Sequence, residues 1–359
     1  MQNDFQTISV GTIPNYTVTI APGLLEQCGQ LLQRVIPPCK AAVITDTNVA
    51  PLYLERTKAS LENAGFSVCS FPFPAGEQSK NLNTLSQILE FLAQNQLTRT
   101  DCVAALGGGV TGDMAGLAAA LYLRGIRYVQ LPTSLLAAVD SSVGGKTAVD
   151  LSAGKNLAGA FLQPAAVLCD TSCLSTLPPL FFADGAAEAI KTGVLFDKEL
   201  FTAFQEGLVR PGSEPLPRVI ARCVACKAGV VERDEKEQGE RKLLNLGHTV
   251  GHAIEKCSGF TVPHGHAVGI GMAVIARAAE TLGWAKEPLA GCISACLASN
   301  DLPTGTAFSP EELAEAALSD KKRSGDTITL VVPERIGHCV LKKLPVAELR
   351  SVIRAGMEG

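Results

Sequence analysis

Four of the five histidines in this chain, His248, His252, His264 and His266, lie in two short neighbouring segments. His248 and His252 are four positions apart, a spacing that places both rings on one face of a helix. Neutral imidazole is a preferred ligand of zinc, and a catalytic zinc site has three protein ligands and one open position. The cluster therefore predicts a divalent-metal site; the alternative is a set of hydrogen-bonded polar groups in a helical core. Thr249 stands where the H-E-x-x-H motif has glutamate, which argues against a metallopeptidase.

A carboxylate and an ammonium group, Glu188 and Lys191, lie three positions apart in an alanine-rich segment. Helical spacing places them on one face, and the apolar residues around them indicate burial. A buried carboxylate without a partner is costly, so Glu188 is a candidate third metal ligand beside two histidines. Lys191 is then a candidate cation for a substrate anion. The alternative is a surface ion pair worth only ~0–1 kcal/mol.

Three glycines, Gly107, Gly109 and Gly112, fit the pattern G-x-G-x-x-G between an apolar strand and a helical segment. Such a turn allows the backbone to approach a pyrophosphate, whose charge the helix N-terminus stabilises. No acidic residue ends a strand about 20 positions later, so the ordinary dinucleotide-binding arrangement is absent. Asp46 and Asn48, which follow an earlier strand, are better candidates for ribose hydroxyls. The alternative is a tight strand-to-helix turn without a ligand.

The segment D140-S-S-V-G-G-K-T147 shares G-K-T with the P-loop of nucleotide-triphosphate-binding proteins. Asp140 stands where that motif has its first glycine, so an ATPase is not indicated. Lys146 and Lys155 remain candidate cations. Cys223 and Cys226 form one C-x-x-C without a second pair, which does not indicate a zinc or redox site.

The composition is that of a globular chain, with 359 residues of which 47% are hydrophobic and 18% charged. Its length exceeds what one hydrophobic core usually supports, so two domains are expected. A net charge of −4 and a pI near 5.8 argue against a nucleic-acid or membrane partner. The sequence starts without a signal-peptide pattern and has no apolar run of ~20 residues, so a cytoplasmic protein is expected. Its cysteines, dispersed through apolar segments, are expected to be reduced thiols.

Short apolar runs alternate with helical patterns in the first half, which predicts a parallel sheet with helices on both faces. Strands are expected at 5–20 (as a pair), 41–45, 66–71 and 102–106, and helices at 24–35, 82–92 and from the glycine turn to about 123. Later helices are expected at 186–196, 217–231, 248–256, 267–282 and 288–299. A capping box at 309–312 predicts a further helix start, and 327–332 with 339–344 predict a hairpin. We therefore expect an α/β domain at 1–177 and a mainly helical domain at 178–359.

Ten motifs follow one another along the chain: D46-x-N48, P74-A-G-E-Q-S-K80, G107-G-G-V-T-G-D113, D140-S-S-V-G-G-K146, G154-K-N156, G185-A-A-E-A-I-K191, D234-E-K-E237, R241-x-x-L-N-L-G-H-T-V-G-H-A-I-E255, H264-G-H-A-V-G-I-G-M272 and D320-K-K322. In this order and spacing they resemble the 3-dehydroquinate synthase family. The resemblance covers nearly the whole chain. It implies a dehydroquinate synthase-like fold, with a Rossmann-like NAD-binding domain followed by a helical metal- and substrate-binding domain. It also implies NAD and a divalent metal as cofactors, usually Zn²⁺ with Co²⁺ as a possible substitute, and a homodimer.

The resemblance further implies a role for individual residues. The family's metal ligands fall on Glu188, His248 and His264. Its NAD contacts fall on Asp46, Asn48, Glu77, Lys80, Gly108, Gly109, Val110, Asp113, Thr133, Ser134, Lys155, Cys173, Leu174, Ser175 and Thr176. Its substrate contacts fall on Arg124, Asp140, Lys146, Asn156, Lys191, Lys227, Arg241, Asn245, His252 and Lys321; of the catalytic positions, Glu237 and His252 match proton acceptors, beside Lys146 and Asn245. Two residues depart from the family: His266 stands where many members have glutamate, and Ser134 where many have threonine.

The implied reaction is the second step of the shikimate pathway of aromatic amino acid biosynthesis. It converts 3-deoxy-D-arabino-heptulosonate 7-phosphate to 3-dehydroquinate and phosphate by transient oxidation at C5, loss of phosphate from C7, reduction and ring closure. Another NAD- and metal-dependent sugar phosphate cyclase is one alternative, although Lys227, Arg241, Asn245 and His252 match the dehydroquinate enzymes. A metal-dependent polyol dehydrogenase, which would release NADH, is the other.

Overall fold

The computed structural model describes residues 5–318, 323–324 and 326–358, so the predicted substrate residue Lys321 lies outside the described residues. The chain divides into two compact units. The first contains the chain up to Leu177 together with Leu216–Glu232, and the second contains Pro178–Pro215 and the chain from Arg233 onward. A single division at residue 177 therefore does not describe the chain, because one later segment returns to the first unit.

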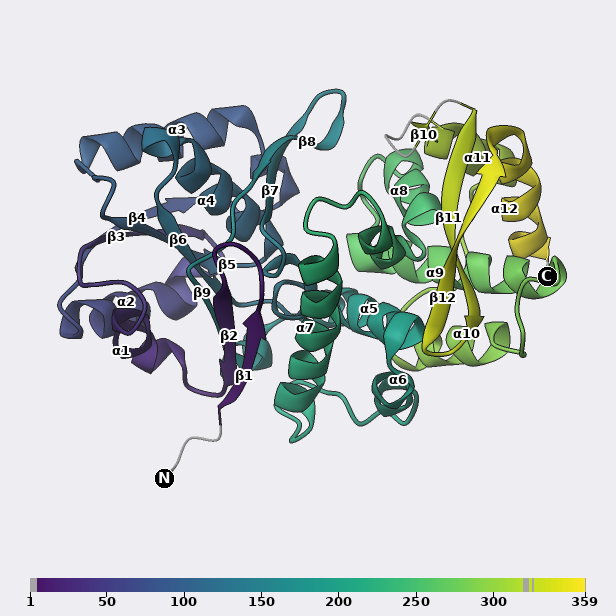
Figure 1. The fold of residues 1–359 in the computed structure, drawn as a ribbon, viewed down its shortest axis with the longest axis horizontal. Helices are drawn as coiled ribbons and strands as arrows, with labels where there is room; N and C mark the ends of the chain where they lie inside the picture. Colours follow the sequence, from purple (N-terminus) through teal and green to yellow (C-terminus); the bar gives the residue numbers. More distant parts are fainter. Residues whose placement is uncertain (1–4, 319–322, 325, 359) are drawn as a thin grey trace. The chain divides into compact units, whose positions relative to one another are not determined.

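The first unit is built on a seven-stranded sheet in the order β1-β2-β9-β6-β5-β3-β4 (Figure 1). The strands are β1 Gln6–Val10, β2 Tyr16–Ala21, β3 Lys40–Asp46, β4 Ser67–Phe73, β5 Cys102–Gly107, β6 Arg127–Pro132 and β9 Ala166–Asp170. Neighbouring strands are parallel except β1 with β2, which confirms the predicted parallel sheet. The strand order reverses at β3, between β4 and β5. In such sheets ligands bind beyond the carboxyl ends of the strands at the reversal, here those of β3 and β5.

Helices cover both faces of the sheet, with α1 and α2 on one face and α3 and α4 on the other (Figure 1). They are α1 Cys28–Gln33, preceded by the 3₁₀ turn Leu25–Gln27, α2 Ala50–Asn63, α3 Leu82–Gln94 and α4 Gly109–Leu121. Alternate residues along each strand pack against the helices on opposite faces of the sheet. Ala41 and Val43 of β3 pack on the α1/α2 side, and Ala42 and Ile44 pack on the α3/α4 side. Burial on both faces is the reason that these strands are continuous apolar runs.

A two-stranded antiparallel hairpin, β7 Lys146–Leu151 and β8 Gly154–Phe161, also belongs to the first unit. The sequence pattern predicts no strands in this segment, because glycines interrupt its apolar alternation. One of them is structural: a Cβ on Gly159 would lie 2.3 Å from the main-chain oxygen of Thr147, so only glycine fits there. The first unit also contains the short turns Glu77–Ser79, Tyr122–Arg124, Ala137–Ser141 and Thr171–Thr176.

Helix α7, Leu216–Arg233, is the segment that returns to the first unit. Its apolar side is buried at Ile220 and Val224. On the same helix, Lys227 Nζ donates to the main-chain oxygen of Asp140 at 2.8 Å and to its carboxylate at 2.5 Å. The periodicity of this helix predicts a buried face, but it carries no information about which domain buries that face.

The second unit is mainly helical, as predicted. Its helices are α5 Pro179–Phe196, α6 Lys198–Gln205, α8 His248–Cys257, α9 His264–Thr281, α10 Ala290–Ser299, α11 Pro310–Leu318 and α12 Leu349–Glu358, with the 3₁₀ turns Glu240–Asn245 and Val346–Glu348. Strands β11 Thr327–Arg335 and β12 His338–Pro345 form the predicted hairpin, beside the short β10 Arg323–Ser324. The capping box is present, since Ser309 N donates to Glu312 Oε2 at 2.8 Å. Among the described residues, no helix combines the length and apolar character needed to span a bilayer.

Helix α9 is buried along most of its length and packs against α5, α8, α10 and α12. Two glycines set its distance from its neighbours. A Cβ on Gly265 would lie 1.9 Å from the main-chain oxygen of Asp184 in α5, and one on Gly271 would lie 2.0 Å from that of Gly247, which precedes α8. Backbone therefore touches backbone where α5 and α8 meet α9, and these three helices carry the candidate metal ligands.

Replacing Gly271 with alanine is expected to destabilise the protein by about 1–3 kcal/mol, because the new methyl group overlaps main-chain atoms that cannot move alone. Gly291→Ala in α10 is the matched control, since a Cβ there meets nothing within 4 Å, and alanine is the better helix former. Denaturant unfolding of both variants measures the difference. Equal stability of Gly271→Ala and wild type would show that α8 and α9 are not in close contact.

Candidate active site

Glu188, His248 and His264 converge on one point in the second unit. They come from three different helices, α5, α8 and α9. Glu188 Oε1 lies 3.7 Å from His248 Nε2 and 3.5 Å from His264 Nε2, and the two rings are 5.2 Å apart at their centroids. Atoms bound tetrahedrally to one zinc at ~2.0–2.1 Å would lie about 3.3 Å apart. The three side chains therefore have the types and the spacing of a three-ligand zinc site.

The other ring nitrogens of the two histidines already have partners. His248 Nδ1 lies 3.1 Å from the main-chain oxygen of Leu246, and His264 Nδ1 lies 3.2 Å from Glu255 Oε2. Both partners accept hydrogen bonds, so each Nδ1 carries a proton and each Nε2 is directed at Glu188. Metal-binding histidines are commonly oriented in this way by a carbonyl or carboxylate.

The charges around Glu188 favour a cation between the three side chains. Glu188 is 1% exposed, and its Oε1 receives no hydrogen bond from any residue in the described part of the chain. Burial opposes ionisation, but Lys191, which lies against Oε2, and His264 together lower the pKa of Glu188 to about 2. Burial likewise disfavours a charged His264, yet Glu188 and Glu255 raise its pKa to about 10. An orphaned carboxylate oxygen facing two imidazoles fits a bound metal ion.

A second grouping, His252, Glu255 and His264, also brings three possible ligand atoms within 4.8 Å of one another. It shares His264 with the first grouping but approaches that ring from its Nδ1 side. The first grouping is the better metal site because both of its Nε2 atoms are directed at a buried carboxylate oxygen that has no hydrogen-bond partner among the described residues. Glu255 is 2% exposed and orients His264. The sequence pattern predicts no role for Glu255, although this residue lies three positions after His252 on the same helical face.

The loop between α7 and α8 carries three further predicted residues, Glu237, Arg241 and Asn245. Asn245 Nδ2 donates to Glu237 Oε1 at 2.6 Å. Glu237 has a φ of 58°, a strained backbone conformation for a residue with a side chain, of a kind that occurs often at functional sites. The loop is pinned by Asp234, whose carboxylate accepts from the backbone N–H groups of Gln238, Gly239 and Arg241 at 2.7–3.0 Å.

In the first unit, the end of β3 and the glycine turn after β5 meet. Asp46 Oδ2 accepts a hydrogen bond from Thr111 Oγ1 at 3.3 Å, while Oδ1 accepts from the backbone of Asn48 at 2.9 Å. The two strands are parallel neighbours, which brings together segments that are far apart in sequence. Gly108 precedes the first residue of α4, so the predicted cofactor residues Gly109 and Val110 form the helix N-terminus.

A buried lysine connects several predicted cofactor and substrate residues. Lys80 is 6% exposed, and its Nζ lies 2.5 Å from Asp113 Oδ2 and 2.6 Å from Asn156 Oδ1. Burial disfavours the charged amine, but Asp113 and Glu77 raise the pKa of Lys80. Lys155 lies 3.6 Å from Glu77. The hairpin β7–β8 is therefore tied to the start of α4 through one side chain.

The remaining predicted residues of the first unit lie on its surface or in the turns that follow its strands. Arg124 and Lys146 are exposed, and Arg124 has a φ of 69°. Thr133 N donates to the main-chain oxygen of Gly107 at 3.0 Å, and Ser134 begins the turn that follows β6. Four residues, Cys173, Leu174, Ser175 and Thr176, lie in the 3₁₀ turn after β9, where Tyr53 bonds to the main-chain oxygen of Cys173 at 3.0 Å and also contacts Thr176.

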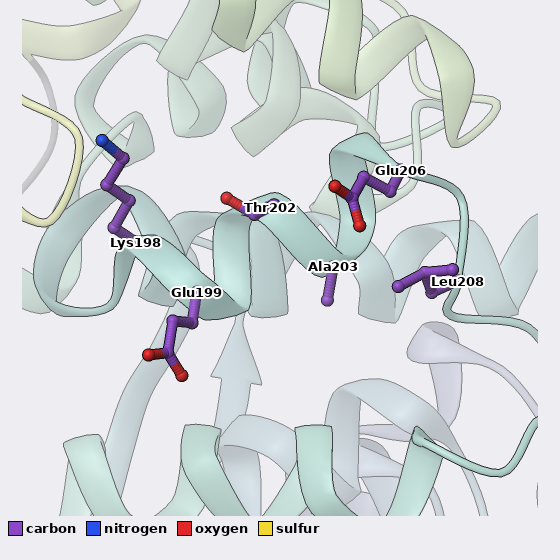
Figure 2. Close-up of a pocket in the computed structure, with 6 residues that line it drawn as sticks. All are labelled: Lys198, Glu199, Thr202, Ala203, Glu206 and Leu208. Atoms are coloured by element: carbon purple, nitrogen blue, oxygen red, sulfur yellow. The ribbon is translucent and has the colours of Figure 1, made fainter.

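A hollow of about 480 Å³ lies on α6 (Figure 2). It is lined by Lys198, Glu199, Thr202, Ala203, Glu206 and Leu208. None of these residues was predicted to bind or react, and the lining contains no histidine, cysteine or glycine turn. It is therefore not a candidate active site.

Comparison with known proteins identifies relatives over nearly the whole chain. Two family models, described as 3-dehydroquinate synthase N-terminal and C-terminal, match residues 70–184 and 185–323. A 3-dehydroquinate synthase of Streptococcus suis is 42% identical over 347 residues, which cover 96% of this chain and 98% of the relative. The solved structure of 2-epi-5-epi-valiolone synthase from Streptomyces hygroscopicus, with NAD⁺ and Zn²⁺ bound, is 26% identical with a TM-score of 0.86, covering 95% and 96% of the two chains. A structure of 2-deoxy-scyllo-inosose synthase is 25% identical with a TM-score of 0.84, covering 98% and 100%.

Both solved structures are sugar phosphate cyclases, so the predicted fold class is confirmed. The identity to 3-dehydroquinate synthase is much higher than the identity to either of these other cyclases. The N-terminal and C-terminal models of this family match consecutive segments that together span residues 70–323. The chain belongs to the 3-dehydroquinate synthase family.

Proposed function

We propose that the chain catalyses the reaction of its family, the conversion of 3-deoxy-D-arabino-heptulosonate 7-phosphate to 3-dehydroquinate and phosphate, with NAD and zinc. The observation that carries the proposal is the convergence of Glu188, His248 and His264, at zinc-ligand spacing, in a chain related to these enzymes over nearly its full length. The solved cyclase with NAD⁺ and Zn²⁺ bound supports the two cofactors. The fit of the orphaned Glu188 oxygen to a cation supports the metal.

Three side chains hold the metal in this proposal, and a lysine acts beside them. When bound, zinc acts as a Lewis acid that lowers the pKa of a coordinated hydroxyl, and NAD accepts and later returns a hydride. Glu188, His248 and His264 would fix the ligand geometry, and Glu255 holds the His264 ring with its Nε2 directed at Glu188. Lys191, next to Glu188, offsets the buried negative charge and has an ammonium group to offer a substrate oxygen.

The substrate is a small polyanion, and the protein has a net charge of −4, so binding requires local cations. The proposed cations are Arg124, Lys146, Lys191, Lys227 and Arg241. Charge-assisted hydrogen bonds contribute about 1.5–3 kcal/mol each. Lys227 is held by Asp140 within the first unit, which orients its ammonium group.

Proton transfer is assigned to Glu237 and His252. Asn245 donates to one carboxylate oxygen of Glu237 and so fixes the orientation of the group that accepts a proton. His252 lies beside the metal ligands, with its ring 5.4 Å from that of His248 and 6.0 Å from that of His264. A general base must lie within hydrogen-bond reach of the proton that it removes, and a substrate held at the metal would present its hydroxyls to this ring.

NAD is assigned to the first unit, at the carboxyl ends of β3 and β5. Asp46 and Asn48 would bind ribose hydroxyls, and the N–H groups at the start of α4 would bind the pyrophosphate. The close packing of Asp46 against Thr111 supports this assignment, because it brings the two parts of the dinucleotide site together.

Incubation of the purified protein with the heptulosonate phosphate and a catalytic amount of NAD tests the proposal. We expect one phosphate per substrate consumed, far in excess of the NAD supplied, and no accumulation of absorbance at the NADH wavelength. Dialysis against a chelator should abolish phosphate release, and added Zn²⁺ or Co²⁺ should restore it.

The same assay distinguishes the two alternatives. A polyol dehydrogenase would accumulate NADH without releasing phosphate. A different sugar phosphate cyclase would release no phosphate from this substrate but would release it from another heptulose or hexose phosphate. Either result would overturn the proposed reaction.

A cytoplasmic homodimer completes the proposal. All twelve cysteines lie in the described residues and are free thiols, as is usual in a reducing compartment. Light scattering on the purified protein would give twice the chain mass of 37.5 kDa, and a monomeric mass would remove this part of the proposal.

A further inference from the structure

His266 and Asp184 form a buried pair beside the candidate metal ligands. The backbone N of His266 donates to Asp184 Oδ1 at 3.0 Å, and His266 Nδ1 lies 3.1 Å from the same oxygen. Both residues are 8% exposed. A carboxylate oxygen accepts hydrogen bonds, so the ring nitrogen is the donor. One oxygen therefore fixes both the start of α9 and the orientation of the imidazole ring.

The pair lies at the contact between two ligand-bearing helices. Asp184 is one turn before Glu188 on α5, and His266 is two positions after His264 on α9. The backbones of α5 and α9 also touch here, because a Cβ on Gly265 would lie 1.9 Å from the main-chain oxygen of Asp184. A change in the Asp184–His266 contact therefore shifts Glu188 relative to His264.

We propose that Asp184 and His266 are a positioning pair for the metal site. Their hydrogen bonds hold α5 and α9 at the separation that brings Glu188 Oε1 to 3.5 Å from His264 Nε2. This inference rests on the proposed function, since it requires a metal ion at the Glu188, His248 and His264 set. Zinc accepts carboxylate and imidazole ligands only within a narrow range near 2.0–2.2 Å, so small helix shifts affect its affinity.

The chemistry of the pair also limits which residues position 266 accepts. A glutamate at this position would place a second carboxylate against Asp184 in a buried contact, and unpaired buried charge is strongly unfavourable. Histidine supplies the donor that Asp184 requires. A glutamate at 266 instead requires a donor at 184, which an asparagine amide would provide. Glutamate at position 266 is therefore predicted to be tolerated only when position 184 is changed to asparagine at the same time.

Four variants test the pair through zinc affinity, measured on metal-free protein by competition with a chromophoric chelator. His266→Phe keeps a ring but removes the hydrogen-bond donor. It is expected to lower the zinc affinity about ten- to hundredfold. His266→Asn keeps a donor near the Nδ1 position and is expected to stay within about threefold of wild type. His266→Glu is expected to lose at least as much affinity as His266→Phe. The double variant Asp184→Asn/His266→Glu is expected to bind zinc at least tenfold more tightly than His266→Glu.

Two further measurements separate positioning from simple stability. The visible absorption spectrum of the Co²⁺-loaded protein should change in His266→Phe and return toward wild type in the double variant. Ile275→Ala, a buried position about three turns along α9, is the control: it should lower the unfolding temperature of the metal-free protein without changing zinc affinity or the Co²⁺ spectrum.

Distinct outcomes test this inference and the proposed function. Wild-type protein that binds no stoichiometric zinc would overturn the proposed metal site, and the positioning role with it. Wild-type zinc affinity in His266→Phe, or a double variant no better than His266→Glu, would overturn the positioning role alone. If His266→Glu does not fold, the comparison of His266→Phe with His266→Asn decides the question by itself.

Discussion

His248→Ala is expected to abolish turnover and to remove stoichiometric zinc. In the proposed site His248 supplies one of the three side chains that hold the ion, and its Nε2 lies 3.7 Å from a buried carboxylate oxygen that has no hydrogen-bond partner among the described residues. A metal Lewis acid contributes several kcal/mol to catalysis, and each 1.36 kcal/mol is a factor of ten in rate. The expected loss in kcat is therefore roughly a thousandfold or more. Metal analysis of the dialysed protein and phosphate release under saturating substrate measure the two effects.

His338→Ala is the matched control for that prediction. His338 is the one histidine outside the cluster, and it is exposed on β12 beside Glu334. Its removal should leave zinc content and kcat unchanged. That result would exclude a general effect of losing any histidine. Full zinc and normal activity in His248→Ala would end the assignment of the metal set.

The convergence of the proposed metal ligands could be predicted from sequence because the histidines are rare and regularly spaced. The chain has five histidines, and a spacing of four on α8 places two of them on one face. Glu188 could be predicted because its apolar surroundings made a buried carboxylate implausible without a partner. In both cases local sequence carries the information, since one helix fixes the direction of each side chain.

Asp184 and Glu255, the two carboxylates that hold His266 and His264, could not be predicted in the same way. Asp and Glu together number 35 in this chain, so no single carboxylate is distinguished by its type. Asp184 meets His266 across 82 positions of sequence, and that contact exists only because Gly265 lets α9 approach α5. Glu255 is closer to its partner, but its role depends on the rotamer of His264. Such information resides in helix packing, which periodicity does not describe.

The same limit applies to the fold. The parallel strands could be predicted because burial on both faces makes them short apolar runs, whereas hairpin β7–β8 could not, because Gly154 and Gly159 interrupt its pattern. Helix α7 was predicted as a helix but assigned to the second domain. Lys227 on this helix bonds to Asp140 in the first unit, a pairing between two segments 87 positions apart that no local pattern indicates.

Arg241→Ala is expected to weaken substrate binding far more than NAD binding. Arg241 is 1% exposed, its guanidinium donates to the main-chain oxygen of Glu235, and its own N–H is held by Asp234. A guanidinium held in this way loses little conformational freedom when it binds an anion. Loss of a charge-assisted hydrogen bond of about 1.5–3 kcal/mol raises the substrate Kd roughly ten- to hundredfold. The Kd of NAD, assigned to the first unit, should change by less than about twofold.

Two further variants test whether the effect comes from the guanidinium group of Arg241. Arg241→Lys keeps the charge but not the planar fork, so its substrate affinity should fall between those of wild type and Arg241→Ala. Arg233→Ala removes a nearby arginine that is exposed and pairs with Glu240, and it should alter neither affinity. Calorimetric titration of the heptulosonate phosphate and of NAD, on variants whose unfolding temperatures are matched to wild type within a few degrees, gives the required comparison. Equal losses for both ligands in Arg241→Ala would mean that Arg241 supports the fold of the loop between α7 and α8 rather than the substrate, and the assignment of this arginine to a substrate anion would then be withdrawn.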